Sequence, residues 1–499
     1  MRQNIKSQLS FGNSSIEKMQ IDLKSRDDIP ALLIGLKYIY MNPELREKIL
    51  AVLKRSISEA VSLNHGRPGM DLWRILVLGI IRLGAGLDYD RLHELANQHS
   101  NIRVMLIVDT WDQEFWTLEA IQDNVRFLTP EVLDQINLLV VQAGHKLLKK
   151  KSEESPQLNG RCDSFVVETD VHFPTDISLL YDAIRKILKF MARIPSSETG
   201  EGWRQWKYLL KKVKKLVRKI GKIRQSINNS KKGKCKTKEG EERKALQQKK
   251  LVEEFAGLHQ ELLRICEGII HRAEKDLKNS ANIGKIQYFI QHAKRQMNQI
   301  NRRVLNGESI PQEEKVYSIF EPHTEWISKG KAGVPQELGL RVCVIEDQHG
   351  FILNHKVMEK QTDDQVVVEI IQDTKNKFPN FNSCSFDKAF HSPSNKIDLS
   401  EILDTVILPK KGKLSVSQLE EESSDDFVSA RHQHSAVESA INSLEHHGLD
   451  RCLDLGLAGF KRYVSLAILG KNIYQLGRII LEQEKLIKAK KFKPHLIAA

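Results

Sequence analysis

The sequence predicts an α/β protein with an all-helical N-terminal region and a large basic helical insertion after the first core strand. Three observations support this fold class. The first 150 residues carry helical patterns only, whereas the run CDSFVVETDVHF after Arg161 is typical of a strand that ends before Pro174. Strand patterns then disappear from 178 to about 316. They return at 339–346, so a helical segment separates the first strand from the others.

Composition and charge limit the class of protein. The 499 residues carry a formal charge of +13, and a chain of this length favours about three domains. The chain begins with no signal-like apolar segment, and its strongest apolar run, 75–81, is too short to cross a bilayer. The six cysteines form no Cys-x-x-Cys pair and no tight cluster, which disfavours a zinc module or a secreted disulfide framework. We therefore expect a cytoplasmic protein that has no membrane partner.

The N-terminal region, 1–150, contains two short helices at 72–83 and 89–97 around the break Gly84-Ala-Gly86. A further helix begins at Thr129, where an N-cap, a proline and a first-turn acid follow one another. Two short helices around a tight turn are typical of a DNA-binding helix-turn-helix. They are as typical of an all-helical packing module, so both interpretations stay open.

The basic excess is concentrated within the predicted insertion, 178–318. Residues 207–250 contain 18 Lys/Arg and 3 Glu, a net +15, so the rest of the chain sums to −2. Apolar residues in this segment recur at alternating spacings of four and three, which predicts a heptad seam on a basic helix: Leu209, Val213, Leu216, Ile220, Ile223 and Ile227. Dense like charges repel unless a polyanion relieves them, which indicates nucleic acid as partner of residues such as Lys211, Lys212 and Lys215. A coiled-coil hairpin with a solvated basic surface is the alternative.

The core is predicted in two parts, 158–177 and 319–480, followed by a basic C-terminal tail at 481–499. The first part holds the first strand and the start of a helix near Asp176. The elements of the second part are expected as strands at 339–346 and 350–358 around the hairpin turn Asp347-Gln-His-Gly350, a helix at 364–378, strands at 383–387 and 405–408, and helices from about 428. Without the insertion, the order is strand, strand, strand, helix, strand, strand, helix.

Three acids occupy informative positions in this order. Asp163 lies on the first strand, Asp387 ends the strand that follows the predicted helix, and Glu438 lies on the late helix. Open α/β sheets bind ligands at strand ends, so these carboxylates can converge. Carboxylates are the hard ligands that Mg²⁺ prefers, and two ions ~3.5–4 Å apart can stabilise both the attacking and the leaving oxygen of a phosphodiester. The alternative is that these are ordinary surface carboxylates, of which a chain with 64 acids has many.

The first two acids have competing interpretations. Asp163 and Asp170 point to opposite faces of a regular strand, so only a bulge would let both face one metal. Asp170 and Asp176 flank Pro174, where an aspartate commonly makes a turn or caps a helix, which favours Asp163. Asp387 precedes a polar loop and could act as a structural cap there.

Six long strings carry a resemblance to a known family: VVETDVHFPTD near residue 167, FEPHTEWISKGKAGVPQELGL from Phe320, VCVIEDQHGFILNHKVM, SFDKAFHSP from Ser385, LPKKGKLS from Leu408, and HSAVESAINSLEHHGLDRCLDLGLAGFKRYVSLAILGKNI from His434. With these strings the sequence closely resembles a bacterial insertion-sequence DDE transposase of the ISNCY group. The likeness runs through essentially the whole chain.

The resemblance implies an RNase H-like catalytic core with a helical DNA-binding region before it. It also implies an Asp, Asp, Glu site for two Mg²⁺ or Mn²⁺ ions, placed by motif position at Asp163, Asp387 and Glu438. The implied activity is cleavage at transposon ends and joining of the freed 3′-OH to target DNA, in a nucleoid-associated homodimer or larger synaptic assembly that the heptad helix could help to build. A nuclease without strand transfer and an inactive DNA-binding remnant are the alternatives.

The sequence departs from the superfamily near the third acid. Where Tyr, Arg, Glu and Lys are common, this chain has Arg431, His434, Glu438 and Glu445. The catalytic Glu is retained, but the usual lysine contact to DNA is in doubt. Phosphate contacts could come instead from nearby cations, although solvated surface side chains are the alternative for each: Lys410, Lys411, Lys413 and Arg431. A zinc site at His434 and Glu438 lacks a third ligand at metal-binding spacing.

Overall fold

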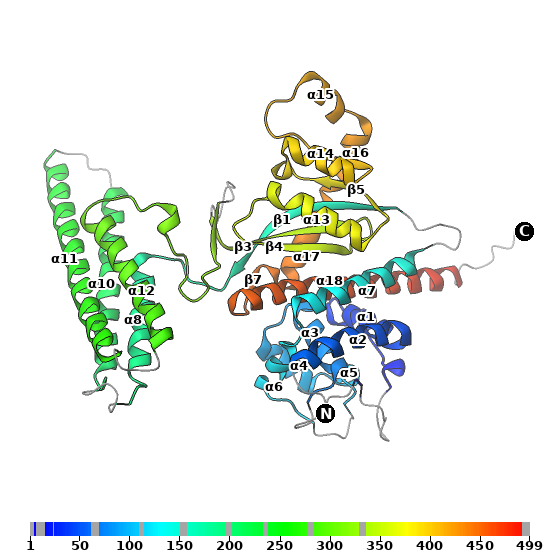
Figure 1. The fold of residues 1–499 in the computed structure, drawn as a ribbon, viewed down its shortest axis with the longest axis horizontal. Helices are drawn as coiled ribbons and strands as arrows, with labels where there is room; N and C mark the ends of the chain where they lie inside the picture. The colour runs from blue at the N-terminus through cyan, green and yellow to red at the C-terminus, as the bar shows by residue number, and fades with distance from the viewer. Residues whose placement is uncertain are drawn as a thin grey trace, which may run out of the picture. The chain divides into compact units, whose positions relative to one another are not determined.

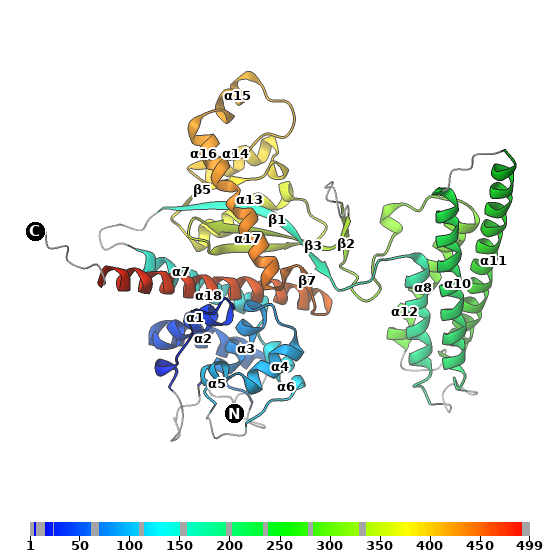
Figure 2. The same ribbon diagram turned by 180° about the vertical axis from the view of Figure 1, so that it is seen from behind.

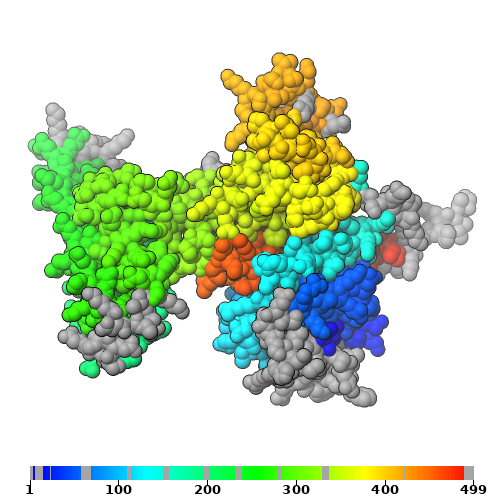
Figure 3. Space-filling view, in the orientation of Figure 1, coloured from blue at the N-terminus to red at the C-terminus, as the bar shows by residue number. Residues whose placement is uncertain are grey.

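The computed structural model describes residues 4–5, 15–22, 24–60, 69–108, 114–149, 157–195, 202–232, 238–277, 283–328 and 336–491. The chain divides into two compact units (Figure 1). The first contains 1–170 and 325–499, and the second, green in Figure 3, contains 171–324. The predicted insertion, 178–318, falls within the second unit. The mixed α/β class is confirmed.

The first unit is built around one mixed seven-stranded sheet. Its central path runs β2-β3-β1-β5-β6, while β4 also pairs with β3 and β7 pairs with β1. Strands β1, β5 and β6 are parallel, whereas β3 is antiparallel to β1, β2 and β4. The strands are β1 (Leu158–Thr169), β2 (Glu325–Ser328), β3 (Gln336–Asp347), β4 (Ile352–Met358), β5 (Phe381–Phe386), β6 (Thr405–Ile407) and β7 (Arg451–Cys452).

Helices cover both faces of this sheet. Helix α13 (Asp363–Lys377) covers one face, with α14 (Pro393–Ile402) beside it (Figure 1). Helix α17 (Ala436–Leu444) crosses the other face, as the reverse view shows (Figure 2). Helix α16 (Asp425–His434) precedes α17 and packs on β5. Both faces of the sheet are therefore covered, which explains the nearly continuous apolar run of β3 from Leu338 to Ile345.

The N-terminal helices share a single hydrophobic core with the sheet. Every residue of α3 is buried, and α18 (Gly456–Lys491) packs against α1, α3 and α7. The predicted boundary near residue 150 therefore does not separate two compact units. The seven helices of this region are α1 (Ile29–Met41), α2 (Pro43–Ala60), α3 (Leu72–Gly84), α4 (Tyr89–Gln98), α5 (Ser100–Met105), α6 (Leu118–Val125) and α7 (Pro130–Leu148).

Close helix packing depends on glycine at the contact of α1 with α18. A Cβ atom at Gly477 would lie 2.0 Å from the carbonyl oxygen of Ala31. The backbones can approach this closely only because Gly477 has no side chain. By contrast, a Cβ at Gly221 in the second unit would have no neighbour within 4 Å.

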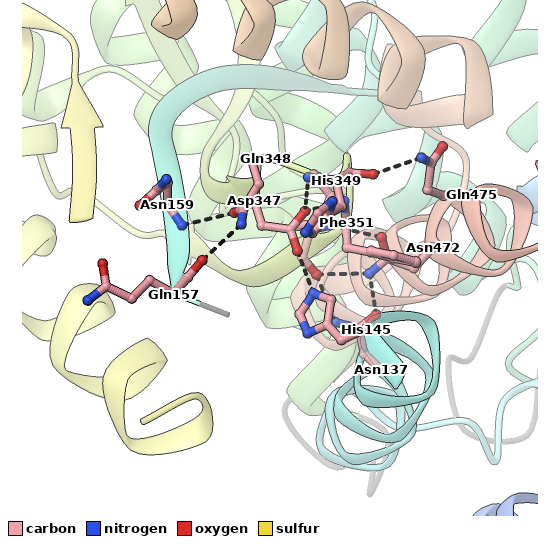
Figure 4. A network of polar contacts seen from close by, with 11 residues as sticks. Asn137, His145, Gln157, Asn159, Asp347, Gln348, His349, Phe351, Asn472 and Gln475 are labelled. Atoms are coloured by element: carbon pink, nitrogen blue, oxygen red, sulfur yellow. Dashed lines mark hydrogen bonds and ion pairs between the residues drawn. The ribbon is translucent and has the colours of Figure 1, made fainter. Parts of the chain in front are cut away.

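Polar contacts fix the β3–β4 turn to two of these helices (Figure 4). The fully buried Asp347 accepts hydrogen bonds from the N–H groups of His349 and Phe351, and its other oxygen lies 2.6 Å from Nε2 of His145 on α7. Asn472 of α18 accepts a hydrogen bond from the N–H of Ile352 and donates to its carbonyl. The hairpin turn that the sequence predicts is thus present, and its position is set by α7 and α18.

A buried ionic cluster joins α3 to the start of α18. Asp454, 5% exposed at its side chain, accepts hydrogen bonds from Arg82 at 2.6 Å and from Arg462 at 2.7 Å. The guanidinium carbon of Arg82 lies 3.6 Å from the centre of the Tyr89 ring, a cation–π contact. These contacts compensate a charge that is otherwise costly to bury.

The second unit contains four long helices with a core of their own. In the predicted seam, Val213, Leu216 and Ile220 are buried in this core, so that part of the seam is not free to bind a second copy. The seam at these residues therefore packs within its own unit, and the assembly of several copies stays a prediction. The helices are α8 (Asp176–Met191), α10 (Trp206–Lys232), α11 (Lys238–Leu277) and α12 (Ile283–Ile300).

One expectation about the C-terminal part needs correction. The late helix is not continuous, because α16 ends at His434, α17 follows Ser435, and the chain breaks again at Gly448, where φ is +91°. The helices expected towards the end of the chain are present, since α18 extends to Lys491, beyond the start of the predicted basic tail at 481. Within the described ranges, no helix is long and apolar enough to cross a membrane.

Candidate active site

Asp163 lies in the middle of β1, between the two strands that flank it. It pairs with Val344 of β3, and the β1–β3 register runs without a shift from Gly160 to Glu168. Alternation along a regular strand therefore turns Asp163 away from its neighbour Cys162, which is fully buried. Oδ1 of Asp163 accepts a hydrogen bond of 2.7 Å from the N–H of Ser164.

The register of β5 brings Asp387 beside Asp163. In the parallel pair β1–β5, Cys162 lies opposite Phe386, and Asp387 is the next residue after Phe386. Continuing this register places Asp163 and Asp387 level with each other, on strands roughly 4.8 Å apart. Asp387 stands at an N-cap position, yet its side chain makes no capping hydrogen bond. The structural-cap interpretation of this carboxylate therefore has no support.

Glu438 lies in the first turn of α17, the helix that packs on β1. Its side chain is exposed. Since α17 begins only after the break at Ser435, the position of Glu438 depends on how α16 and α17 dock on the sheet rather than on one straight helix.

Electrostatics link the three acids. Burial, opposed by the hydrogen bond from the Ser164 N–H and aided by the negative charges of Asp387, Asp363 and Glu438, raises the pKa of Asp163 from 3.8 to about 6. The charges of Asp387 and Glu438 therefore act on the carboxylate of Asp163. All three predicted acids therefore contribute to one region of negative potential.

Two residues of α16 hold this region together. Nη1 of Arg431 donates a hydrogen bond of 3.1 Å to the carbonyl of Phe386, the residue before Asp387. Nδ1 of the buried His434 lies 2.9 Å from Oγ of Ser385. Burial, together with the charge of Arg431, lowers the pKa of His434 to about 4, so the ring is neutral at pH 7. His434 is thus engaged with β5, which argues against the zinc interpretation.

The rival acids lie elsewhere. Asp170 is exposed just after the end of β1, where Oδ1 lies 3.9 Å from Arg451. Asp176 begins α8 in the second unit and forms an ion pair of 2.9 Å with Arg303. Neither is among the principal charges that act on Asp163. Asp163 is therefore the candidate that lies beside Asp387 in the sheet.

Sequence reasoning missed Asp363, which follows the N-cap Thr362 of α13. The residue is 8% exposed, Oδ2 lies 3.7 Å from Nη1 of Arg341, and Oδ1 is buried without a hydrogen-bond partner. From the sequence, an acid in the first turn of a capped helix is explained by the helix dipole alone. Only the fold reveals its proximity to Asp163.

The predicted cationic residues differ in their surroundings. Lys410 is engaged locally, because Nζ donates to Gln418 at 2.7 Å and its N–H donates to Glu422 at 2.8 Å. Lys411 and Lys413 are exposed in the same loop. The three other predicted DNA contacts lie on α10 in the second unit, where two are exposed and one is partly buried: Lys211, Lys215 and Lys212.

The predicted helix-turn-helix is present as two helices, but its chemistry favours packing. Helix α3 is buried along its whole length. The exposed side chains of α4 include Asp90 and Glu94 against the single cation Arg91. A helix that enters a DNA groove needs a cationic or neutral surface, because the phosphates are negative. The packing-module interpretation is therefore the better supported of the two.

The donor chemistry of the acidic site suits a divalent cation, with one reservation about geometry. Asp163, Asp387 and Glu438 offer only hard carboxylate oxygens. The negative charges of Asp387 and Glu438 act on Asp163, and a bound divalent cation would offset this repulsion. In the described part of the chain, however, no three His, Cys, Asp or Glu side chains lie close enough to hold one ion together. The pair Asp163 and Asp387 is preassembled by strand register, and Glu438 completes no shared site in this conformation.

Comparison with protein-family models, with curated proteins and with solved structures finds no match to this chain.

Proposed function

We propose that this chain is a metal-dependent DNA transposase of the DDE type. The observation that carries the proposal is the alignment of Asp163 with Asp387 across the parallel pair β1–β5, with Glu438 near enough to act on the same charge. A carboxylate whose pKa is raised by burial and by neighbouring acids is a common feature of functional sites. The sequence strings that resemble ISNCY-group transposases supply the reaction class, because charge alone does not distinguish transposition from other phosphoryl transfers.

The fold supports the same proposal. An antiparallel run of three strands, followed by two parallel strands with helices on both faces, is compatible with the RNase H-like core that the resemblance implies. The second unit lies between β1 and β2 in the chain, where the insertion is expected.

The role of each group follows from its position. Asp163, Asp387 and Glu438 would hold Mg²⁺ or Mn²⁺. When bound, such ions polarise the phosphodiester and stabilise the oxygens between which the phosphoryl group moves. Arg431 orients the end of β5 through the Phe386 carbonyl, and the exposed Lys411 and Lys413 are placed to contact phosphates. His434, neutral and bonded to Ser385, positions α16 so that Glu438 follows on α17.

Strand transfer tests the proposal directly. Labelled duplexes with the ends of the encoding element, precut to expose the 3′-OH, are incubated with a supercoiled plasmid and Mg²⁺. We expect joined product from the intact chain, a loss of at least about 10²-fold for Glu438→Gln, and no joining by Asp163→Asn or Asp387→Asn. Asp170→Asn is the matched control and should join DNA normally.

Each other outcome identifies an alternative. Nicking of DNA without joining would leave a nuclease with the same acids. Salt-dependent DNA binding without nicking or joining would identify an inactive remnant. The position of Glu438, which completes no shared metal site, would then explain the loss of activity. Equal activity of intact chain and Glu438→Gln would remove Glu438 from the site.

A further inference from the structure

The outer face of helix α10 differs in charge from every other long helix of the second unit. Its 27 residues contain eleven Lys/Arg and no Asp or Glu. Helix α11 carries acids among its cations, for example Glu253 and Glu254 four residues after Lys249 and Lys250. Opposite charges four residues apart stabilise a helix, and like charges at that spacing destabilise it. The charge of α10 is therefore not part of what stabilises its helix.

Six of these cations form one exposed row. They are Lys211, Lys214, Lys215, Arg218, Lys219 and Lys222. Within the described residues, none of the six has an ion pair or a hydrogen bond from its side-chain nitrogen. By contrast, Lys48 of α2 and Arg478 of α18 each pair with an acid four residues away. The opposite side of the same helix is anchored, because Val213, Leu216 and Ile220 are buried in the unit's core. The row is thus held on a fixed support.

We propose that the outer face of α10 is a binding surface for the phosphate backbone of duplex DNA, used without base readout. From Lys211 to Lys222 the helix rises about 17 Å, a length over which duplex DNA presents about ten phosphates. A row of cations on an anchored helix matches such a lattice of charges. The proposal rests on the proposed function only in taking DNA as substrate, and it concerns a surface separate from the acidic site.

Two other anionic partners fit less well. A membrane-surface helix needs an exposed apolar face, but the apolar side of α10 is buried and Tyr208 is its exposed large apolar residue. A single-stranded nucleic acid is held by stacking on aromatic side chains, and α10 has no aromatic residue after Tyr208. Backbone contact to a duplex needs neither feature.

The experiment measures binding of the full-length chain to a random-sequence 30-bp duplex by fluorescence anisotropy, in EDTA, from about 50 to 300 mM salt. The variant replaces Lys211, Lys215, Arg218 and Lys222 by Gln, a good helix former. The control replaces four exposed cations of α11 by Gln, which removes the same net charge: Arg243, Lys249, Lys250 and Arg264.

Each lost phosphate contact lowers the slope of log K against log salt by about 0.9, so we expect a decrease of about 3 to 4 for the α10 variant and less than about 1 for the control. A change below about 1 for the α10 variant, or an equal decrease in both variants, would overturn the proposal. Should the four substitutions unfold α10, as seen by circular dichroism, Lys211→Gln with Lys215→Gln repeats the test with a decrease of about 2.

Two further arms separate the possible failures. Binding to vesicles of phosphatidylcholine and phosphatidylserine that depends on the α10 row, with an unchanged DNA slope, would assign the row to a membrane instead. Glu438→Gln should keep the full salt slope while losing strand transfer. If the salt slope of duplex binding decreases in the α10 variant but neither the intact chain nor any variant joins DNA, the proposed transposase activity is refuted. The proposed DNA-binding surface on α10 is then still supported.

Discussion

Replacing the first acid of the candidate site should stabilise the protein at neutral pH while removing its activity. The perturbation is Asp163→Asn, which keeps the shape of the side chain and an oxygen that can accept the N–H of Ser164. In the native protein this carboxylate is partly buried and is repelled by Asp387, Asp363 and Glu438. The neutral amide does not experience that repulsion, so the free energy of unfolding should rise.

The magnitude follows from the pKa of Asp163. Folding raises this pKa from 3.8 to about 6. A pKa shift of one unit changes the free energy of unfolding by about 1.4 kcal/mol, so the ionised form of Asp163 lowers stability by about 3 kcal/mol well above pH 6. The native state holds the proton more tightly, so the contribution of Asp163 to stability is most favourable below pH 4 and declines as pH rises from 4 to 6. The gain from Asp163→Asn should therefore be about 2 to 3 kcal/mol at pH 8 and near zero at pH 4.

Urea unfolding at pH 8 and at pH 4, followed by far-UV circular dichroism without divalent ions, checks the sign and the size of this effect. Asp170→Asn, exposed at the end of the same strand, is the control and should change stability by less than about 0.5 kcal/mol. Adding 10 mM Mg²⁺ should then stabilise the intact chain by about 1.4 kcal/mol for a Kd of about 1 mM, but not Asp163→Asn. An Asp163→Asn protein less stable than the intact chain at pH 8 would refute the reasoning.

Two further predictions concern the packing of the fold. Asp454→Ala leaves the buried Arg82 without its carboxylate partner and should lower the free energy of unfolding in urea by about 3–5 kcal/mol. Asp123→Ala breaks an exposed ion pair and should lower it by at most about 1 kcal/mol. Equal losses in the two variants would contradict the role of burial. Gly477→Ala places a methyl group against a backbone carbonyl of α1 and should lower the hydrogen-exchange protection of α18 by more than about 10-fold. Gly221→Ala, with open space around it, should instead raise protection in α10, and a loss at Gly221 would show that the α10 helix has a contact there.

The candidate site illustrates how far local sequence patterns extend. Asp163 and Asp387 are placed on or after strands by alternation and by turn residues, which depend on a few neighbouring positions. That they lie level with each other depends on the register Cys162 to Phe386, set between segments more than 200 residues apart. No local pattern encodes that register, because it is selected by which side chains the whole sheet buries.

The same limit explains the corrections. A heptad seam is visible in the sequence because apolar spacing fixes which face of a helix is buried, but spacing does not say against what, and in α10 the partner is the unit's own core. A uniformly apolar helix such as α3 fits both a DNA-reading pair and a packing module, and only its burial on all sides separates them.

The sequence by itself determined the α/β class, the helical segment after the first strand, the concentration of positive charge in one helix and the three acids worth testing, because periodicity, composition and charge are local properties. The tertiary structure decided the register that aligns Asp163 with Asp387, the docking of α17 that brings Glu438 near, the buried Asp363 beside them and the union of the N-terminal helices with the sheet. These depend on contacts between distant segments, whose free energy is known only once the chain is packed.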